Sequence, residues 1–207
     1  GERERRTYDL LVSTPLPLST LALGKLLSAL AYVLLLIVVA IPLETIAFLM
    51  GGVSPAEVIL AQLVLVLTAM GFGAIGLFFS SFLRSTIIAT VLSYASVLTI
   101  VAGIPIIIGA SVPILSFSMG SNPQRLVESI GFIYGAGFLL CTNPFGTAAV
   151  TEALYVSGKG LWFFSETIGG NAHHFVSPWV VFTILYVFFT ALLTLLSIGF
   201  LRRKGST

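Results

Sequence analysis

Four long apolar runs constrain the fold of this chain more than any other feature of its sequence. The runs cover residues 20–43, 57–83, 86–112 and 179–201. Each is long enough for an α-helix to cross a bilayer core, which takes roughly 20 apolar residues. Only 9% of the residues are charged, whereas soluble domains carry about 25%. The sequence therefore predicts an all-α integral membrane protein, with residues 1–207 forming a single domain that contains four transmembrane helices.

The stretch before the first run, residues 1–19, is the most highly charged part of the chain. Arginines and acids cover most of its predicted surface, and one side carries apolar residues at i, i+3, i+4 spacing, namely Tyr8, Leu11 and Val12. Such a short amphipathic helix has to lie against a membrane surface or a partner protein. Thr14–Pro15 ends it, because proline lacks the N–H and restricts the residue before it. We therefore predict a helix and a stiff proline elbow ahead of the first transmembrane helix.

Positive charge predicts the orientation of the four helices, because cytoplasmic loops are enriched in Lys and Arg. With four spans, most of the basic residues fall on one side: Arg3, Arg5, Arg6, Lys25, Arg84, Arg202, Arg203 and Lys204. Only Arg125 and Lys159 fall on the other side. We expect a multi-pass protein of the cell membrane with both termini in the cytoplasm.

Residues 113–178 then form an extracytoplasmic segment. Residues 130–141 are apolar, but the run is short and contains three glycines. A fifth span there would place the basic C-terminal end outside. We therefore predict that residues 126–155 form one or two helices, broken at Asn143–Pro144, which re-enter the outer leaflet or pack on the bundle. Broken helices are tolerated at membrane depth where protein covers the backbone.

Two motifs resemble a cofactor-binding site and a metal site, but each is better explained by a structural role. Gly71, Gly73 and Gly76 match the spacing of a dinucleotide-binding loop, yet they lie inside an apolar run rather than between a strand and a helix. Small residues in a membrane helix favour close helix packing instead. His173–His174 suggests a metal site, but adjacent histidines point in different directions, so an exposed polar loop is the favoured interpretation. We predict no catalytic, cofactor-binding or metal-binding residues in this chain.

Glu44 and Glu57 flank the first outer loop, each near the end of a predicted span. Two interpretations stay open: solvation at the interface, or an outer gate, because ionisable groups near membrane depth are costly. Asn143 and Pro144 are the other candidates for this gate.

Several stretches resemble the type 2 family of ABC transporter permeases. The first is Glu2-Arg3-Glu4-Arg5-Arg6-Thr7-Tyr8-Asp9-Leu10-Leu11, followed by Ser13-Thr14-Pro15 and by Leu23-Gly24-Lys25-Leu26-Leu27. Residues 76–86 are similar to the family's junction between its fourth and fifth helices. Asn143-Pro144-Phe145 is similar to a step in its last outer segment. Against the family's six spans, the first two are missing here, which suggests a fragment.

The resemblance implies a permease that exports substrate and is not itself an enzyme. A coupling helix over residues 4–13 would rest in a groove of a separate ATPase subunit, which would hold ATP and Mg. The residues implied in that contact are Glu2, Glu4, Arg5, Arg6, Thr7, Tyr8, Leu10, Leu11, Thr14 and Pro15. Two permeases and two ATPase subunits would form the transporter, surrounded by lipid and without a nucleic acid partner. The chain itself has no Walker motif.

Two other classes remain as rivals. A secondary transporter or channel-like protein usually carries acids or broken helices near the bilayer midplane, whereas the acids here lie at the ends of the spans. A membrane-embedded hydrolase would need a convergent catalytic set. Ser111 is the nearest candidate for its nucleophile, and no known hydrolase motif surrounds it.

Overall fold

A computed structural model describes residues 18–51, 54–120, 130–168 and 171–205. Within these ranges, four helical segments are long and apolar enough to cross a membrane. They are α2 (Leu18–Leu49), α3 (Pro55–Phe82), the continuous run of α4 (Thr86–Leu98), η1 (Thr99–Gly103) and α5 (Ile104–Met119), and α9 (Pro178–Gly205). The predicted fold class, an all-α integral membrane protein, is confirmed.

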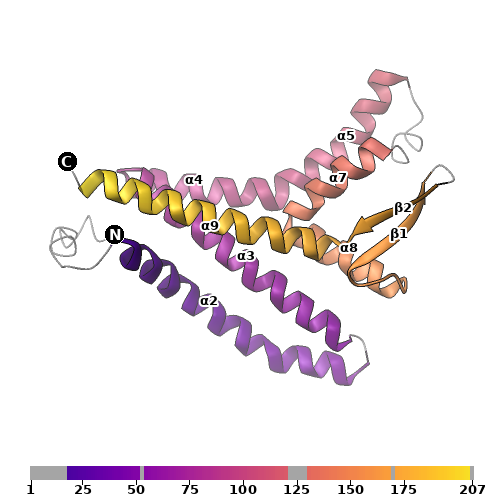
Figure 1. Ribbon diagram of the computed structural model, residues 1–207, viewed down its shortest axis with the longest axis horizontal. Helices are drawn as coiled ribbons and strands as arrows, with labels where there is room; N and C mark the ends of the chain where they lie inside the picture. The colour runs from indigo at the N-terminus through magenta and orange to yellow at the C-terminus, as the bar shows by residue number, and fades with distance from the viewer. Residues whose placement is uncertain (1–17, 52–53, 121–129, 169–170, 206–207) are drawn as a thin grey trace.

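The helices place two sets of connections at opposite ends of the molecule (Figure 1). One end holds the start of α2, the short α3–α4 junction and the end of α9. The other end holds the α2–α3 turn, α8 (Pro144–Val156) and a hairpin of β1 (Phe163–Ile168) and β2 (Asn171–Val176). The sequence pattern predicts the first end to be cytoplasmic and the second to be outside.

The core lies in the seam between α3 and α9, the two helices in most extensive contact. Val64 and Leu67 of α3 pack on Phe182 and Tyr186 of α9. Nearer the other end of the seam, a second cluster joins Ala74, Ile75 and Leu193. The expected packing role of the glycines is confirmed at two of them. A Cβ on Gly71 would lie 2.8 Å from Tyr186 Cδ1, and one on Gly73 would lie 3.1 Å from Leu26 Cδ1.

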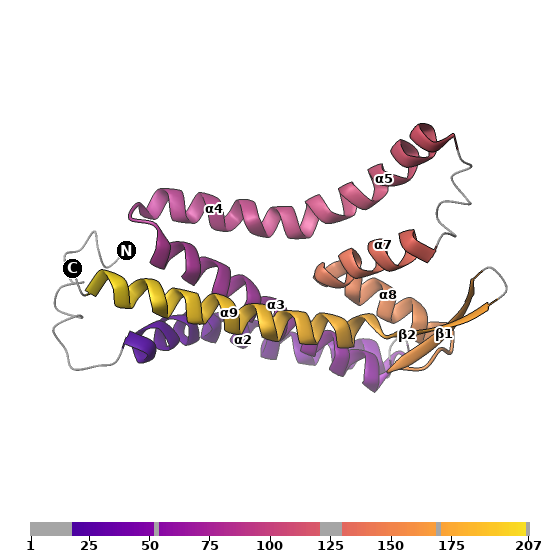
Figure 2. The ribbon, with the colours of Figure 1, turned by 45° about the horizontal axis from the view of Figure 1, so that its top comes forward.

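The third helix is interrupted by a five-residue π-helix, η1, between α4 and α5. A π-turn breaks the regular i→i−4 pattern and releases backbone carbonyls from their usual partners. Beyond it, α5 angles away from α9 (Figure 2) and continues to Met119, past the predicted end of this span at residue 112. Gly120 ends the helix in the left-handed conformation, with φ of 59°.

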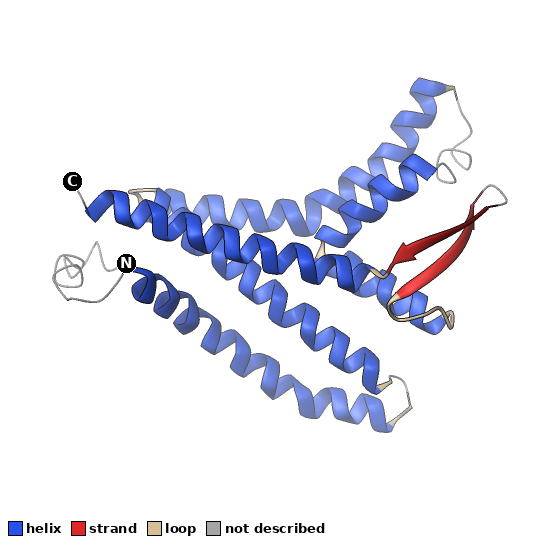
Figure 3. Cartoon of the chain, in the orientation of Figure 1, coloured by secondary structure: helices blue, strands red, loops and turns tan. Residues whose placement is uncertain are grey.

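The described part of the outer segment contains two short helices and a hairpin. The predicted break is found at Asn143, between α7 (Ile130–Thr142) and α8. The antiparallel hairpin, red in Figure 3, was not predicted, and it corrects the interpretation of His173–His174 as a loop: both lie on β2. Opposite each other in the register, Phe164 and Phe175 stack with their ring centroids 5.4 Å apart, and this contact helps to hold the pair of strands together.

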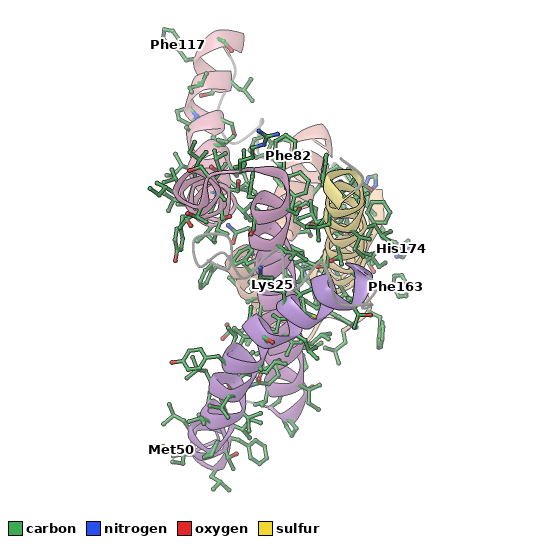
Figure 4. All side chains as sticks on the ribbon, turned by 90° about the vertical axis from the view of Figure 1, so that its left-hand side faces the viewer. Lys25, Met50, Phe82, Phe117, Phe163 and His174 are labelled. Atoms are coloured by element: carbon green, nitrogen blue, oxygen red, sulfur yellow. The ribbon has the colours of Figure 1, made fainter. Side chains whose placement is uncertain are left out.

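Large apolar side chains cover much of the outer surface of the bundle. In Figure 4, Met50 at the end of α2 and Phe117 on α5 lie at opposite extremes of the molecule, and they are 83% and 91% exposed. Such a surface is costly in water but suits contact with lipid chains or with other transmembrane helices.

Candidate functional site

The predicted coupling residues lie outside the described residues. They are Glu2, Glu4, Arg5, Arg6, Thr7, Tyr8, Leu10, Leu11, Thr14 and Pro15. The described chain begins at Leu18, the first residue of α2.

A cavity of about 310 Å³ lies at the predicted outer end, between α2, α3, α8 and the start of α9. Its lining includes both acidic residues of the predicted gate, Glu44 from α2 and Glu57 from α3. A third carboxylate, Glu152, joins them from α8. The structure therefore brings together two of the four predicted gate residues and adds an acid that the sequence did not single out.

The position of Glu57 follows from the way α3 begins. Ser54 is the N-cap and Pro55 occupies the first turn, where a missing N–H costs nothing. The Ser54 N–H donates to Glu57 Oε2 at 2.6 Å, and the Glu57 N–H donates to Ser54 Oγ at 3.3 Å. This capping box satisfies two backbone donors at the helix start. Glu57 therefore has a structural role, which engages one of its oxygens.

Glu44 is held by a side chain from the neighbouring helix. Gln62 Nε2 lies 2.7 Å from Glu44 Oε1 and 2.6 Å from Glu44 Oε2. The interaction ties α2 to α3 near the α2–α3 turn. Because the Gln62 amide is neutral, the negative charge of Glu44 is solvated by this contact but not cancelled.

The α8 side of the cavity contributes two polar residues of different character. Glu152 is exposed, whereas Thr151 is only 9% exposed. No described residue forms a hydrogen bond with Thr151 Oγ1. On the α9 side, Trp179 is fixed by a hydrogen bond from its Nε1 to Leu161 O at 2.7 Å and by an edge contact with Trp162.

The other two predicted gate residues, Asn143 and Pro144, are not part of this lining. Asn143 is fully buried, and its Oδ1 caps α8 by accepting a hydrogen bond from Gly146 N at 2.9 Å. Its Nδ2 donates to Ile100 O at 2.8 Å and to Val101 O at 2.9 Å. Both carbonyls belong to the π-helix η1. Asn143 therefore clamps the outer segment to the interrupted third helix.

No group of three or more His, Cys, Asp or Glu in the described part of the chain is placed to hold a metal ion. The described geometry thus offers a cavity and a clamp that joins the outer segment to the third membrane helix. Taken with the four membrane helices, it suits a protein that moves molecules across a bilayer.

The family model of the ABC-2 family transporter protein matches residues 1–144. The chain belongs to the ABC-2 transporter family. It is a multi-pass membrane protein and a permease component of an ABC transporter. The match extends from the predicted coupling stretch to Asn143–Pro144 and includes Glu44 and Glu57. No curated protein and no solved structure matches this ABC-2 chain.

Proposed function

We propose that this ABC-2 permease exports its substrate with energy from a separate ATPase subunit, which holds ATP and Mg. The observation that carries the proposal is the family match, which covers the whole charged stretch from Glu2 to Pro15. Because the chain has no Walker motif of its own, the nucleotide is expected in the partner. A second permease copy would complete the membrane part.

In this proposal, residues 4–13 form the helix that contacts the ATPase. Closure of the ATPase would push this helix, and the elbow at Thr14–Pro17 would pass the movement to α2, because two fixed proline torsions leave the connection little freedom. The helices α3 and α9 share the buried core, so they would move together. Glu44 and Gln62 join α2 to α3 near the end of α2 that is far from the elbow. Movement of α2 would therefore reshape the cavity there.

In the proposed orientation, both termini lie in the cytoplasm and the cavity lies at the outer face of the cell membrane. Its support is the clustering of Lys and Arg at one end of the four spans.

The double variant Leu10→Asp plus Leu11→Asp tests the contact with the ATPase. Burying an apolar side chain of this size contributes about 1.5–3 kcal/mol, so replacing two of them by acids is expected to reduce ATPase co-purification at least about tenfold. The matched control is Ser206→Asp plus Thr207→Asp, which adds the same two charges at the other terminus and should leave co-purification unchanged. Undiminished co-purification with the first variant would contradict the proposal, as would ion-driven transport by the permease alone.

A further inference from the structure

We propose that the cavity between α2, α3 and α8 binds an organic cation, whose charge lies near Glu44 and Glu152 and whose apolar part contacts the rest of the lining. The inference rests on the proposed export function, because an exported molecule would have to pass this end of the permease. It names the substrate class that the cavity would accept.

The charge of the lining is of one sign. Three carboxylates face the cavity, from Glu44, Glu57 and Glu152, and no Lys, Arg or His is among the described lining residues. The hydrogen bonds to the carboxylates of Glu44 and Glu57 come from a neutral amide and a backbone N–H, so they leave the negative charge in place. A hollow lined by charge of one sign concentrates ions of the opposite sign.

A buried hydroxyl without a partner is the second observation. Helical threonines of this chain commonly donate to the carbonyl four residues earlier, as Thr68 does to Val64 O and Thr194 does to Thr190 O. Thr151, which is about as buried as Thr194, makes no such bond. Buried polar side chains nearly always have a hydrogen-bond partner. Because Thr151 lines the acidic cavity, a polar group of a bound molecule would supply the missing partner.

The remaining lining explains why the cation would be organic. Val58, Val64, Tyr155 and Trp179 present mostly apolar surface, which a hydrated inorganic ion would not contact favourably. No three described ligands converge on a metal position. The volume, about 310 Å³, falls within the range of small-molecule sites. Aromatic faces such as those of Trp and Tyr also attract cations.

The test measures binding of benzylammonium, whose N–H groups can donate to a hydroxyl, to the full chain in lipid nanodiscs, beside benzenesulfonate. Both probes are water-soluble and join a phenyl ring to a compact charged group, but their charges are opposite. We expect the cation to bind and the anion not to bind. Glu152→Gln should weaken binding of the cation about fivefold, and Glu44→Gln plus Glu152→Gln should weaken it more than about tenfold. Glu166→Gln, which removes an acid on β1, should have no effect.

Thr151→Val keeps the shape of the side chain and removes the hydroxyl. It should weaken binding of the cation about threefold, and it provides a second test if loss of the Glu44–Gln62 contact perturbs folding. Equal binding of the two probes would overturn the inference, as would cation binding unchanged by Glu152→Gln and by Thr151→Val. The assay contains no ATPase, so a failure here leaves the proposed coupling standing. Loss of ATPase contact in the Leu10 and Leu11 variant, in turn, leaves cation binding intact.

Discussion

The variant Asn143→Leu is expected to lower the free energy of unfolding by about 2–3 kcal/mol. Asn143 is fully buried, and one side chain makes both the α8 cap and the two bonds to η1. Leucine has a similar size but no polar atom, so the carbonyls of Ile100 and Val101 and the Gly146 N–H would all lose a partner. The measurement is reversible unfolding of the purified protein in mixed micelles.

Asn143→Asp separates the two roles of this side chain. An aspartate still caps α8 through a carboxylate oxygen, but its other oxygen would face the carbonyls of Ile100 and Val101, which need a donor. We therefore expect Asn143→Asp to be at least as unstable as Asn143→Leu at neutral pH. Wild-type stability in Asn143→Asp would show that the cap alone matters and that the clamp on the π-helix does not.

The second large effect is expected for Gly71→Ala, which should lower the free energy of unfolding by about 1–3 kcal/mol. The added Cβ would lie 2.8 Å from Tyr186 Cδ1 and 2.9 Å from Tyr186 Cε1. The ring has little freedom to move, because it stacks on Phe182 at a centroid distance of 4.0 Å and its hydroxyl donates to Thr142 O at 3.1 Å. The α3–α9 seam would have to open.

Gly76→Ala provides the matched control on the same helix. A Cβ there meets no described atom within 4 Å, and alanine favours a helix over glycine by about 1 kcal/mol. Thermal unfolding should therefore occur at the wild-type temperature or slightly above it. If both alanine variants unfolded alike, the close approach at Gly71 would not contribute to stability.

The transmembrane helices could be predicted from the sequence because their signal is local: an apolar run of sufficient length reports a span without knowledge of its neighbours. The clamp at Asn143 could not be predicted in the same way. Its partners in η1 lie 43 and 42 residues earlier in the chain, and nothing in the apolar run from Thr86 marks the π-turn. The sequence predicts a helix break at Asn143–Pro144, but the partners of the Asn143 side chain depend on how α7 and α8 pack.

The residues that line the acidic cavity could be predicted only in part, for the same reason. Glu44 and Glu57 flank one short turn, so the sequence places them together. Glu152 and Thr151 join them only because α8 packs against α3. The hairpin, by contrast, had a local signal, because a Gly169–Gly170 pair separates its two six-residue strands.

The central claim is that the coupling stretch and the basic C-terminal end lie on one face of the membrane, and the acidic cavity on the other. Single cysteines at Arg5, Met50 and Arg203, introduced in a Cys141→Ala background, test it directly with a membrane-impermeant maleimide on intact cells. Met50 is 83% exposed at the end of α2, beside the cavity helices. We predict that Met50→Cys is labelled on intact cells, and that Arg5→Cys and Arg203→Cys are labelled only after permeabilisation. Labelling of Arg5→Cys and Arg203→Cys from opposite faces would contradict the account.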